Sequence, residues 1–292
     1  MLLDEALEMG KCNSVLVTGG TGYFARGFVR AMLNEKYSNR ICIFSRGEYQ
    51  QAVMRREFCD DPRLRWMIGD VRDRDRLRRA MDGVRLVVHA AALKRIEVGA
   101  YNADEMAKTN IDGARNVIAA ARDAGVEKVV ALSSDKAYQP VSPYGQSKAL
   151  AESLFLNANN DRGANGPIFA CVRYGNVAGS TGSIIPTWRE ILKATDTVPV
   201  RDPEATRFWM ERDEAVELVL RTAETMKGGE LAIPELPAYR VADLAEAMGA
   251  RMNVTGANSY EKRHEAMNDE LSSDRARRMS VDEIRLRLRH VA

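Results

Sequence analysis

Five residues in the middle of the chain have the types and spacing needed to move protons while a hydride moves. They lie in the segment SSDKAYQPVSPYGQSK, and they are Ser134, Asp135, Lys136, Tyr144 and Lys148. A tyrosine and a lysine four residues apart share one side of a helix. A nearby ammonium favours the ionised form of a phenol, whose ordinary pKa is about 10. Tyr144 is therefore a candidate base for oxidising an alcohol.

Asp135 and Lys136 are not required by such an oxidation. They add a second acid and a second base next to the tyrosine and lysine. A carboxyl and an ammonium side by side shift each other's pKa strongly, so the observed pKa values describe the pair rather than either residue. A surface turn with an ordinary ion pair is the alternative interpretation.

The elements that must position these residues alternate between apolar runs and helical periods. Strands are expected at residues 14–18, 40–45, 64–68, 84–90, 127–134 and 168–175. Helices are expected from the glycine turn to about residue 34, and over 73–81, 103–125 and about 143–157. Apolar strands alternating with helices predict an α/β fold with a doubly wound parallel sheet. Ser134 then ends the fifth strand, and Tyr144 and Lys148 lie on the next helix.

The turn after the first strand is typical of dinucleotide-binding proteins. Gly19 permits the tight turn, and Gly22 lets the backbone approach a pyrophosphate at the start of the helix. The second strand ends in Ser45 and Arg46 rather than in the acid that binds the ribose of NAD. A hydroxyl and a guanidinium suit a 2′-phosphate. The sequence therefore predicts NADP as the cofactor, and a surface arginine without a role is the alternative.

Other contacts to the cofactor are expected where further strands end. Asp70 follows the third strand, where a carboxylate could accept a hydrogen bond from the adenine amino group. HAAALK, after the fourth strand, is small enough for the cofactor to lie across the sheet edge. The residues expected to contact the cofactor are Gly19, Thr21, Gly22, Tyr23, Phe24, Ser45, Arg46, Asp70, Val71, Ala90, Ala91, Lys94, Tyr144 and Lys148.

Composition argues against several classes of partner and site. The net charge of +2 gives no global reason to expect binding to nucleic acid or to an anionic membrane. No window approaches the roughly 18 apolar residues of a membrane span, and the N-terminus lacks the apolar run of a signal peptide. The four cysteines show no metal-site spacing and are expected to be free thiols. We expect a cytoplasmic protein without a metal site.

The order of several short motifs resembles that of extended short-chain dehydrogenase/reductases. TGGTGYFA, SRGE, AALK, TNIDG, SSDKA, YGQSK, RYGNV and TRFW follow that order over roughly residues 13–266. The resemblance points most specifically to UDP-N-acetylglucosamine 4,6-dehydratases, above all the C5-inverting enzymes of pseudaminic acid synthesis. SSDKA is the discriminating motif, because 4-epimerases of similar build lack the Asp-Lys pair.

This resemblance implies an NADP-dependent lyase and a role for each of the five residues. Tyr144, with Lys148 beside it, would deprotonate the sugar 4-hydroxyl while NADP takes the C4 hydride, and Ser134 would bond the same oxygen. The resulting ketone would acidify the C5 proton for removal by Lys136. Asp135, in its protonated form, would donate to the departing 6-hydroxyl. The hydride would then return to C6.

The resemblance also implies the contacts to a UDP-N-acetylhexosamine substrate. Asn176 and Arg207 would bind its diphosphate and uridine. The full expected set is Lys94, Asn176, Ser183, Val200, Arg207 and Glu261. Family members typically carry R-P-G-E-K-x-H-E near the end, whereas this chain reads NSYEKRHE, with Asn258 in place of the arginine. Weaker nucleotide binding or a different donor sugar would follow.

Three regions are expected along the chain. They are an NADP-binding Rossmann domain over residues 10–175, an interleaved substrate lobe over 176–270 and a basic C-terminal helix over 271–292. We expect that helix to be solvated, with an oligomer contact as the alternative. The resemblance implies a homo-oligomer, a dimer or larger. Two other functions stay open, a retaining dehydratase or 4-epimerase on a related UDP-sugar and a non-catalytic NADP-binding scaffold.

Overall fold

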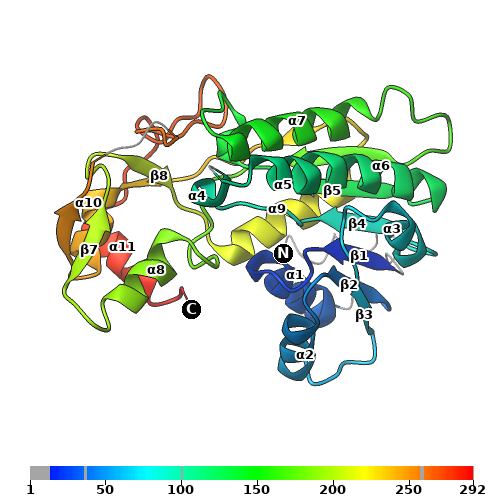
Figure 1. Ribbon diagram of the computed structural model, residues 1–292, viewed down its shortest axis with the longest axis horizontal. Helices are drawn as coiled ribbons and strands as arrows, with labels where there is room; N and C mark the ends of the chain where they lie inside the picture. Colours follow the sequence, from blue (N-terminus) through cyan, green and yellow to red (C-terminus); the bar gives the residue numbers. More distant parts are fainter. Residues whose placement is uncertain (1–13, 36–37, 100, 257–259, 292) are drawn as a thin grey trace.

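The computed structural model describes residues 14–35, 38–99, 101–256 and 260–291 (Figure 1). Asn258, Cys12 and the N-terminal segment considered as a possible leader lie outside the described residues. Within the described part of the chain, no helix is both long and apolar enough to cross a membrane. The described cysteines, Cys42, Cys59 and Cys171, are free, as predicted.

A seven-stranded parallel sheet forms the centre of the protein, in the order β3-β2-β1-β4-β5-β6-β9. Its strands are β1 (Val15–Thr18), β2 (Ile41–Ser45), β3 (Leu64–Ile68), β4 (Leu86–His89), β5 (Lys128–Leu132), β6 (Ile168–Val172) and β9 (Leu231–Ala232). The predicted doubly wound fold is confirmed. The strand order reverses between β1 and β4, and such a switch point opens a crevice at the carboxyl edge of a sheet.

Alternate side chains of each strand enter two hydrophobic cores, because successive residues of a strand point to opposite faces. Val15 and Val17 belong to one core, and Leu16 to the other. The first face is covered by α1 (Tyr23–Asn34), α2 (Glu48–Glu57) and α9 (Arg212–Thr225). The second is covered by α3 (Arg74–Ala80), α6 (Gly113–Asp123) and α7 (Pro143–Asn157). The sheet is therefore buried on both sides.

A smaller lobe lies beside the sheet, at the left of Figure 1. It contains a parallel pair of strands, β7 (Thr197–Val200) with β11 (Arg251–Val254), and an antiparallel pair, β8 (Thr206–Phe208) with β10 (Ala238–Arg240). Its helices are α8 (Ile184–Ile191), α10 (Val241–Ala247) and α11 (Val281–Leu288). Between lobe segments the chain returns to the sheet, because α9 packs on α1 and β9 pairs with β6.

The single helix expected over 103–125 is interrupted. After the short helices α4 (Ile96–Gly99) and α5 (Ala103–Ala107), residues Lys108–Asp112 form a π-helical turn, and α6 follows. The buried Asn110 lies in this turn. The Asn110 side chain accepts a hydrogen bond from the Leu93 N–H (2.8 Å) and donates one to Ser147 Oγ (2.9 Å). It thereby joins the loop after β4 to α7.

The expected C-terminal helix is also shorter than predicted and is not solvated. Only Val281–Leu288 is helical, with Ser280 accepting a cap hydrogen bond from the Glu283 N–H (3.1 Å). Ile284 and Leu288 are buried in the core of the lobe. The preceding residues form isolated bridges with other segments, which is incompatible with a continuous helix.

Candidate active site

A cavity of about 1440 Å³ runs along the carboxyl edge of the sheet and under the lobe. It brings together side chains from the Rossmann half and from the lobe. The predicted site residues that line it are Gly19, Thr21, Gly22, Tyr23, Phe24, Ser45, Arg46, Asp70, Val71, Ala90, Ala91, Lys94, Ser134, Lys136, Tyr144, Lys148, Asn176, Ser183, Val200, Arg207 and Glu261. Asp135 is the predicted site residue that does not line the cavity.

The glycine turn before α1 has the shape needed to hold a pyrophosphate. Gly19 has a φ of +64°, and a Cβ there would come within 2.9 Å of the backbone of Ala91. Gly22 occupies the N-cap of α1 and leaves the first N–H groups of that helix without a side-chain cap. Free N–H groups at a helix N-terminus bind phosphate well. The turn therefore fits a dinucleotide.

The residues at the end of β2 suit the adenosine part of such a cofactor. Ser45 Oγ accepts a hydrogen bond from Gln51 Nε2 (3.0 Å), which leaves its own proton available to a ligand. Arg46 is exposed, and its guanidinium is 4.0 Å from the Asp70 carboxylate. Gln51 was not predicted as a site residue, because a glutamine within a polar helix carries no pattern that marks it as buried.

A one-turn 3₁₀ helix, η3 (Asp135–Ala137), carries the acid and the base between β5 and α7. Ser134 caps it, since its Oγ accepts from the Lys136 N–H (3.3 Å) and its hydroxyl donates to Asp135 Oδ1 (2.9 Å). Gly145 in α7 lets this turn pack closely, because a Cβ at that position would overlap the backbone oxygen of Lys136. The first turn of α7 is fixed by Ser142 Oγ, which accepts from the Gly145 N–H (3.1 Å).

Tyr144 and Lys148 lie one turn apart on α7, and both are buried. Lys148 Nζ donates a hydrogen bond to the Leu132 carbonyl (2.6 Å), and burial lowers the pKa of its ammonium. Burial raises the pKa of Tyr144, while the charge of Lys136 and a hydrogen bond with Ser134 oppose that increase. In the protein alone, Tyr144 therefore holds its proton.

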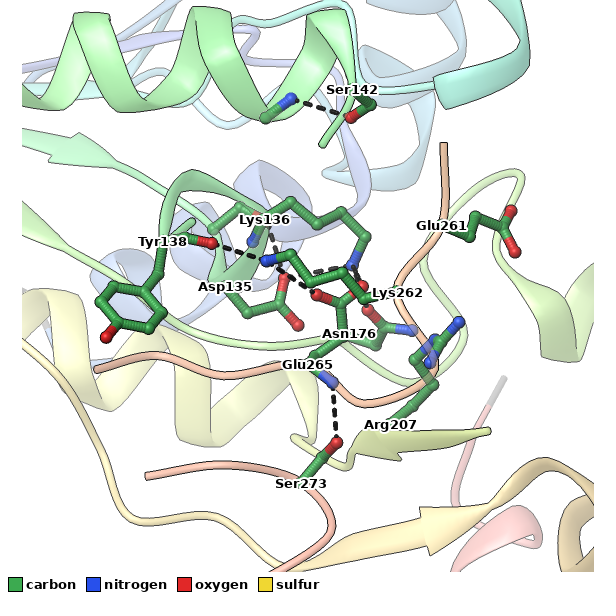
Figure 2. Close-up of polar contacts among 12 residues, drawn as sticks. Asp135, Lys136, Tyr138, Ser142, Asn176, Arg207, Glu261, Lys262, Glu265 and Ser273 are labelled. Carbon is green, nitrogen blue, oxygen red and sulfur yellow. Dashed lines mark hydrogen bonds and ion pairs between the residues drawn. The ribbon is translucent and has the colours of Figure 1, made fainter. Parts of the chain in front are cut away.

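Lys136 is at the centre of a cluster of polar groups at the wall of the cavity. Its Nζ lies 3.1 Å from Asp135 Oδ1, 3.2 Å from Asn176 Oδ1 and 3.4 Å from Glu265 Oε1. Figure 2 shows these oxygens converging on the ammonium from three separate segments. The side chains of Asp135 and Glu265 are 1% and 3% exposed.

The charges in this cluster favour different protonation states for its two carboxyls. Burial raises the pKa of Asp135, the positive charge of Lys136 opposes this increase, and the negative charge of Glu265 adds to it. Burial also opposes ionisation of Glu265, but the positive charges of Lys136, Arg207 and Lys262 lower its pKa overall. Burial alone would lower the pKa of Lys136, yet the charges of Asp135 and Glu265 raise it overall. The surroundings thus favour the proton on Asp135 over Glu265, and the ammonium form of Lys136.

The residues predicted to bind substrate lie on the lobe side of the cavity. Arg207 NH1 donates to the carbonyls of Thr206 (2.7 Å) and Arg263 (3.0 Å). Glu261 forms an ion pair with Arg201, another cavity-lining residue that sequence analysis did not select. Burial lowers the pKa of Lys94, helped by neighbouring positive charges.

Glu265 is the cluster residue that sequence analysis did not assign to the site. The signal was present, because Glu265 ends the EKRHE stretch of the family pattern. Its contact with Lys136 depends on how the lobe folds back over η3, and spacing along the chain does not indicate this.

Comparison with known proteins agrees with the resemblance seen in the sequence. The sequence model of a family described as polysaccharide biosynthesis protein matches residues 15–285. An inverting UDP-N-acetylglucosamine 4,6-dehydratase from Campylobacter jejuni is 42% identical over 264 residues, which are 89% of this chain and 78% of the relative. A UDP-glucose 4-epimerase from Rickettsia canadensis is 36% identical over 87% of this chain and 77% of its own.

Among solved structures, Pen from Bacillus thuringiensis superposes on this chain with a TM-score of 0.91. The two are 32% identical, and the match covers 96% of this chain and 99% of the other. The similarity therefore extends over the sheet and the lobe together.

Proposed function

The chain belongs to the polysaccharide biosynthesis protein family, and on that premise we propose that it is a UDP-N-acetylglucosamine 4,6-dehydratase that inverts C5. The observation that carries the proposal is the cluster around Lys136, which places a second acid and a second base beside Tyr144. An alcohol oxidation alone would need neither group.

The first step requires a base at the sugar 4-hydroxyl. Tyr144 takes this proton, and Ser134 orients the same oxygen. A nicotinamide cofactor, when bound, supplies the acceptor for the C4 hydride and returns that hydride to C6. Since burial raises the pKa of Tyr144, its ionisation needs further positive charge in the site. Lys148 is buried one turn further along α7, on the same face as Tyr144, and we assign it as a source of this positive charge.

The second step eliminates water from C5 and C6. Lys136, in its neutral form, removes the proton that the 4-ketone has made acidic. Asp135 donates a proton to the departing 6-hydroxyl, which its raised pKa suits. Lys136 then returns a proton to C5, which fixes the configuration there. Asp135 is sealed beneath the cavity, so its proton transfer requires the η3 turn to shift when substrate binds.

We further propose NADP as the form of the cofactor, held by Ser45 and Arg46 through the 2′-phosphate. Asn176 and Arg207 bind the nucleotide part of the substrate. A nucleotide-sugar substrate and free cysteines suit a cytoplasmic enzyme.

The proposal is tested with purified protein, NADP and UDP-N-acetylglucosamine. The expected product is lighter than the substrate by one water, with no net accumulation of NADPH. Proton NMR of a reaction in D₂O reports the configuration and deuterium content at C5. A 4-epimer as the sole product, or NADPH formed in equal amount to product, would rule out dehydration.

A 4-epimerase is the second candidate function, because a curated 4-epimerase is 36% identical over most of the chain. Epimerisation requires Tyr144 as a base, but it has no step in which Asp135 or Lys136 would transfer a proton. The same product analysis separates the two reactions.

A further inference from the structure

Glu265 is part of the cluster around Lys136, although it lies far along the chain from the SSDKA motif. Its Oε1 lies 3.4 Å from Lys136 Nζ, and its Oε2 lies 3.6 Å from Lys262 Nζ. Among the described residues, Oε2 accepts no hydrogen bond. A buried carboxylate with one oxygen unbonded is costly. Its position therefore calls for a physical explanation.

The backbone of Glu265 is fixed by Ser273, to which a dashed line joins it in Figure 2. Ser273 is fully buried. The Glu265 N–H donates to Ser273 Oγ (2.9 Å), and the Ser273 N–H donates to the Glu265 carbonyl (2.7 Å). Ser273 Oγ also bonds Thr206 Oγ1 (2.6 Å), which joins the pair to β8. This anchoring holds the carboxylate against the ammonium of Lys136.

Two carboxyl groups next to one ammonium do not both ionise readily, because like charges in a buried site repel each other. Glu265 faces three cations, Lys136 from η3, Arg207 from β8 and Lys262 from its own segment. Asp135 faces Lys136 as its nearby cation and Ser134 as a neutral donor. The negative charge is therefore better stabilised on Glu265, and the proton on Asp135.

We infer that Glu265 is a positioning residue that acts as the counter-ion of Lys136 and thereby keeps Asp135 in its acid form. Without Glu265, Asp135 would ionise and form an ion pair with the Lys136 ammonium. Asp135 would then lack the proton that the departing 6-hydroxyl needs, and Lys136 would not be the neutral base. Lys136 lines the cavity, so the proton that it must lose before removing one from C5 can leave through the cavity while Glu265 stays ionised. This inference rests on the proposed dehydration.

Glu265→Gln tests it, because the amide keeps the shape of the side chain and removes its charge. Loss of water from UDP-N-acetylglucosamine should slow by about 100-fold or more, the usual size of one acid–base contribution. Hydride transfer from C4 to NADP, followed in a single turnover by absorbance, should persist, and KM should change little. Glu265→Asp should recover part of the dehydration rate.

The pH profile separates this role from a merely structural one. The charged and titratable groups facing the cluster are Lys136, Asp135, Arg207, Lys262 and Tyr144. Removing the negative charge of Glu265 lowers the pKa of both Asp135 and Lys136. In the plot of dehydration rate against pH, the rise on the acid side and the fall on the basic side should therefore both move to lower pH in Glu265→Gln.

Glu270→Gln is the matched control, because it removes one charge from an exposed position in the same segment and should change neither rate nor profile. Dehydration by Glu265→Gln at the wild-type rate would overturn the inference. An equal loss of hydride transfer and dehydration with an unchanged pH profile would also overturn it. So would a Glu265→Asp variant that folds but dehydrates no faster than Glu265→Gln. Absence of water loss in the wild-type protein would instead refute the proposed function.

Discussion

Glu152 on α7 and Arg173, the residue after β6, form a buried ion pair. Arg173 Nε donates to Glu152 Oε2 over 3.0 Å, and the two side chains are 10% and 7% exposed. Arg173 NH1 also donates to the carbonyl of Met267, two residues after Glu265. The pair thus joins α7, the end of β6 and the segment that carries Glu265.

Breaking this pair should destabilise the whole protein. Glu152→Ala leaves a buried guanidinium without its carboxylate, which costs about 3–5 kcal/mol in proteins. The free energy of unfolding, measured in urea, should fall by that amount. Glu190→Ala is the control, because Glu190 is 71% exposed in its pair with Lys193 and should cost less than about 1 kcal/mol. Similar small losses in both variants would contradict the prediction.

Gly145→Ala should misplace the acid and the base without changing their chemistry. The new Cβ overlaps the backbone oxygen of Lys136, so η3 must move away from α7. Displacements of about 1 Å in a site can cost 100-fold in rate. We expect a loss of that order in dehydration. Ser153→Ala, on the exposed side of the same helix, should leave the rate unchanged; equal activity of both variants would show that η3 tolerates the shift.

Lys136→Ala should separate the two halves of the reaction. Tyr144 and Lys148 remain, so hydride transfer from C4 continues, whereas the C5 proton has no base. Dehydration should stop, and the C5 hydrogen should no longer exchange with D₂O. Product mass and NMR measure both effects. Full dehydratase activity in this variant would remove Lys136 from the mechanism.

The sheet and the position of most candidate site residues were predictable because they depend on local patterns. Apolar runs located six strands of the sheet, each beginning within two residues of its expected start. The π-helical turn at Lys108–Asp112 was not predictable, because one wider turn leaves the apolar period of the flanking helices nearly intact. Glu265 was missed because its partner, Lys136, is brought near only by the tertiary fold.

Arg46→Ala should weaken NADP binding selectively. A charge-assisted hydrogen bond contributes about 1.5–3 kcal/mol, which corresponds to roughly a 10- to 100-fold increase in Kd. NAD lacks the 2′-phosphate, so its Kd should change only slightly. Calorimetric titration of both cofactors measures the difference, and Arg46→Lys should lie between the wild type and Arg46→Ala. An equal loss of affinity for NADP and NAD would exclude a 2′-phosphate contact at this residue.

His89 should make the folded protein less stable in mild acid. Its ring is buried at the end of β4, with Nδ1 2.8 Å from Thr18 Oγ1. Burial, and then the charge of Lys148, lower the pKa of His89 from 6.5 to about 3. Between these values the unfolded chain binds a proton that the folded chain does not, so stability falls as pH falls, by up to about 1.4 kcal/mol per unit.

Urea unfolding between pH 7 and pH 4 measures this contribution as the difference in slope between the wild type and His89→Asn. The variant has no ring to titrate, so its stability should depend less on pH over that range. His290→Asn, at an exposed position, should keep the wild-type slope. If His89→Asn and the wild type lose stability in parallel, the acid sensitivity arises from other groups and the His89 ring does not stay neutral as its burial requires.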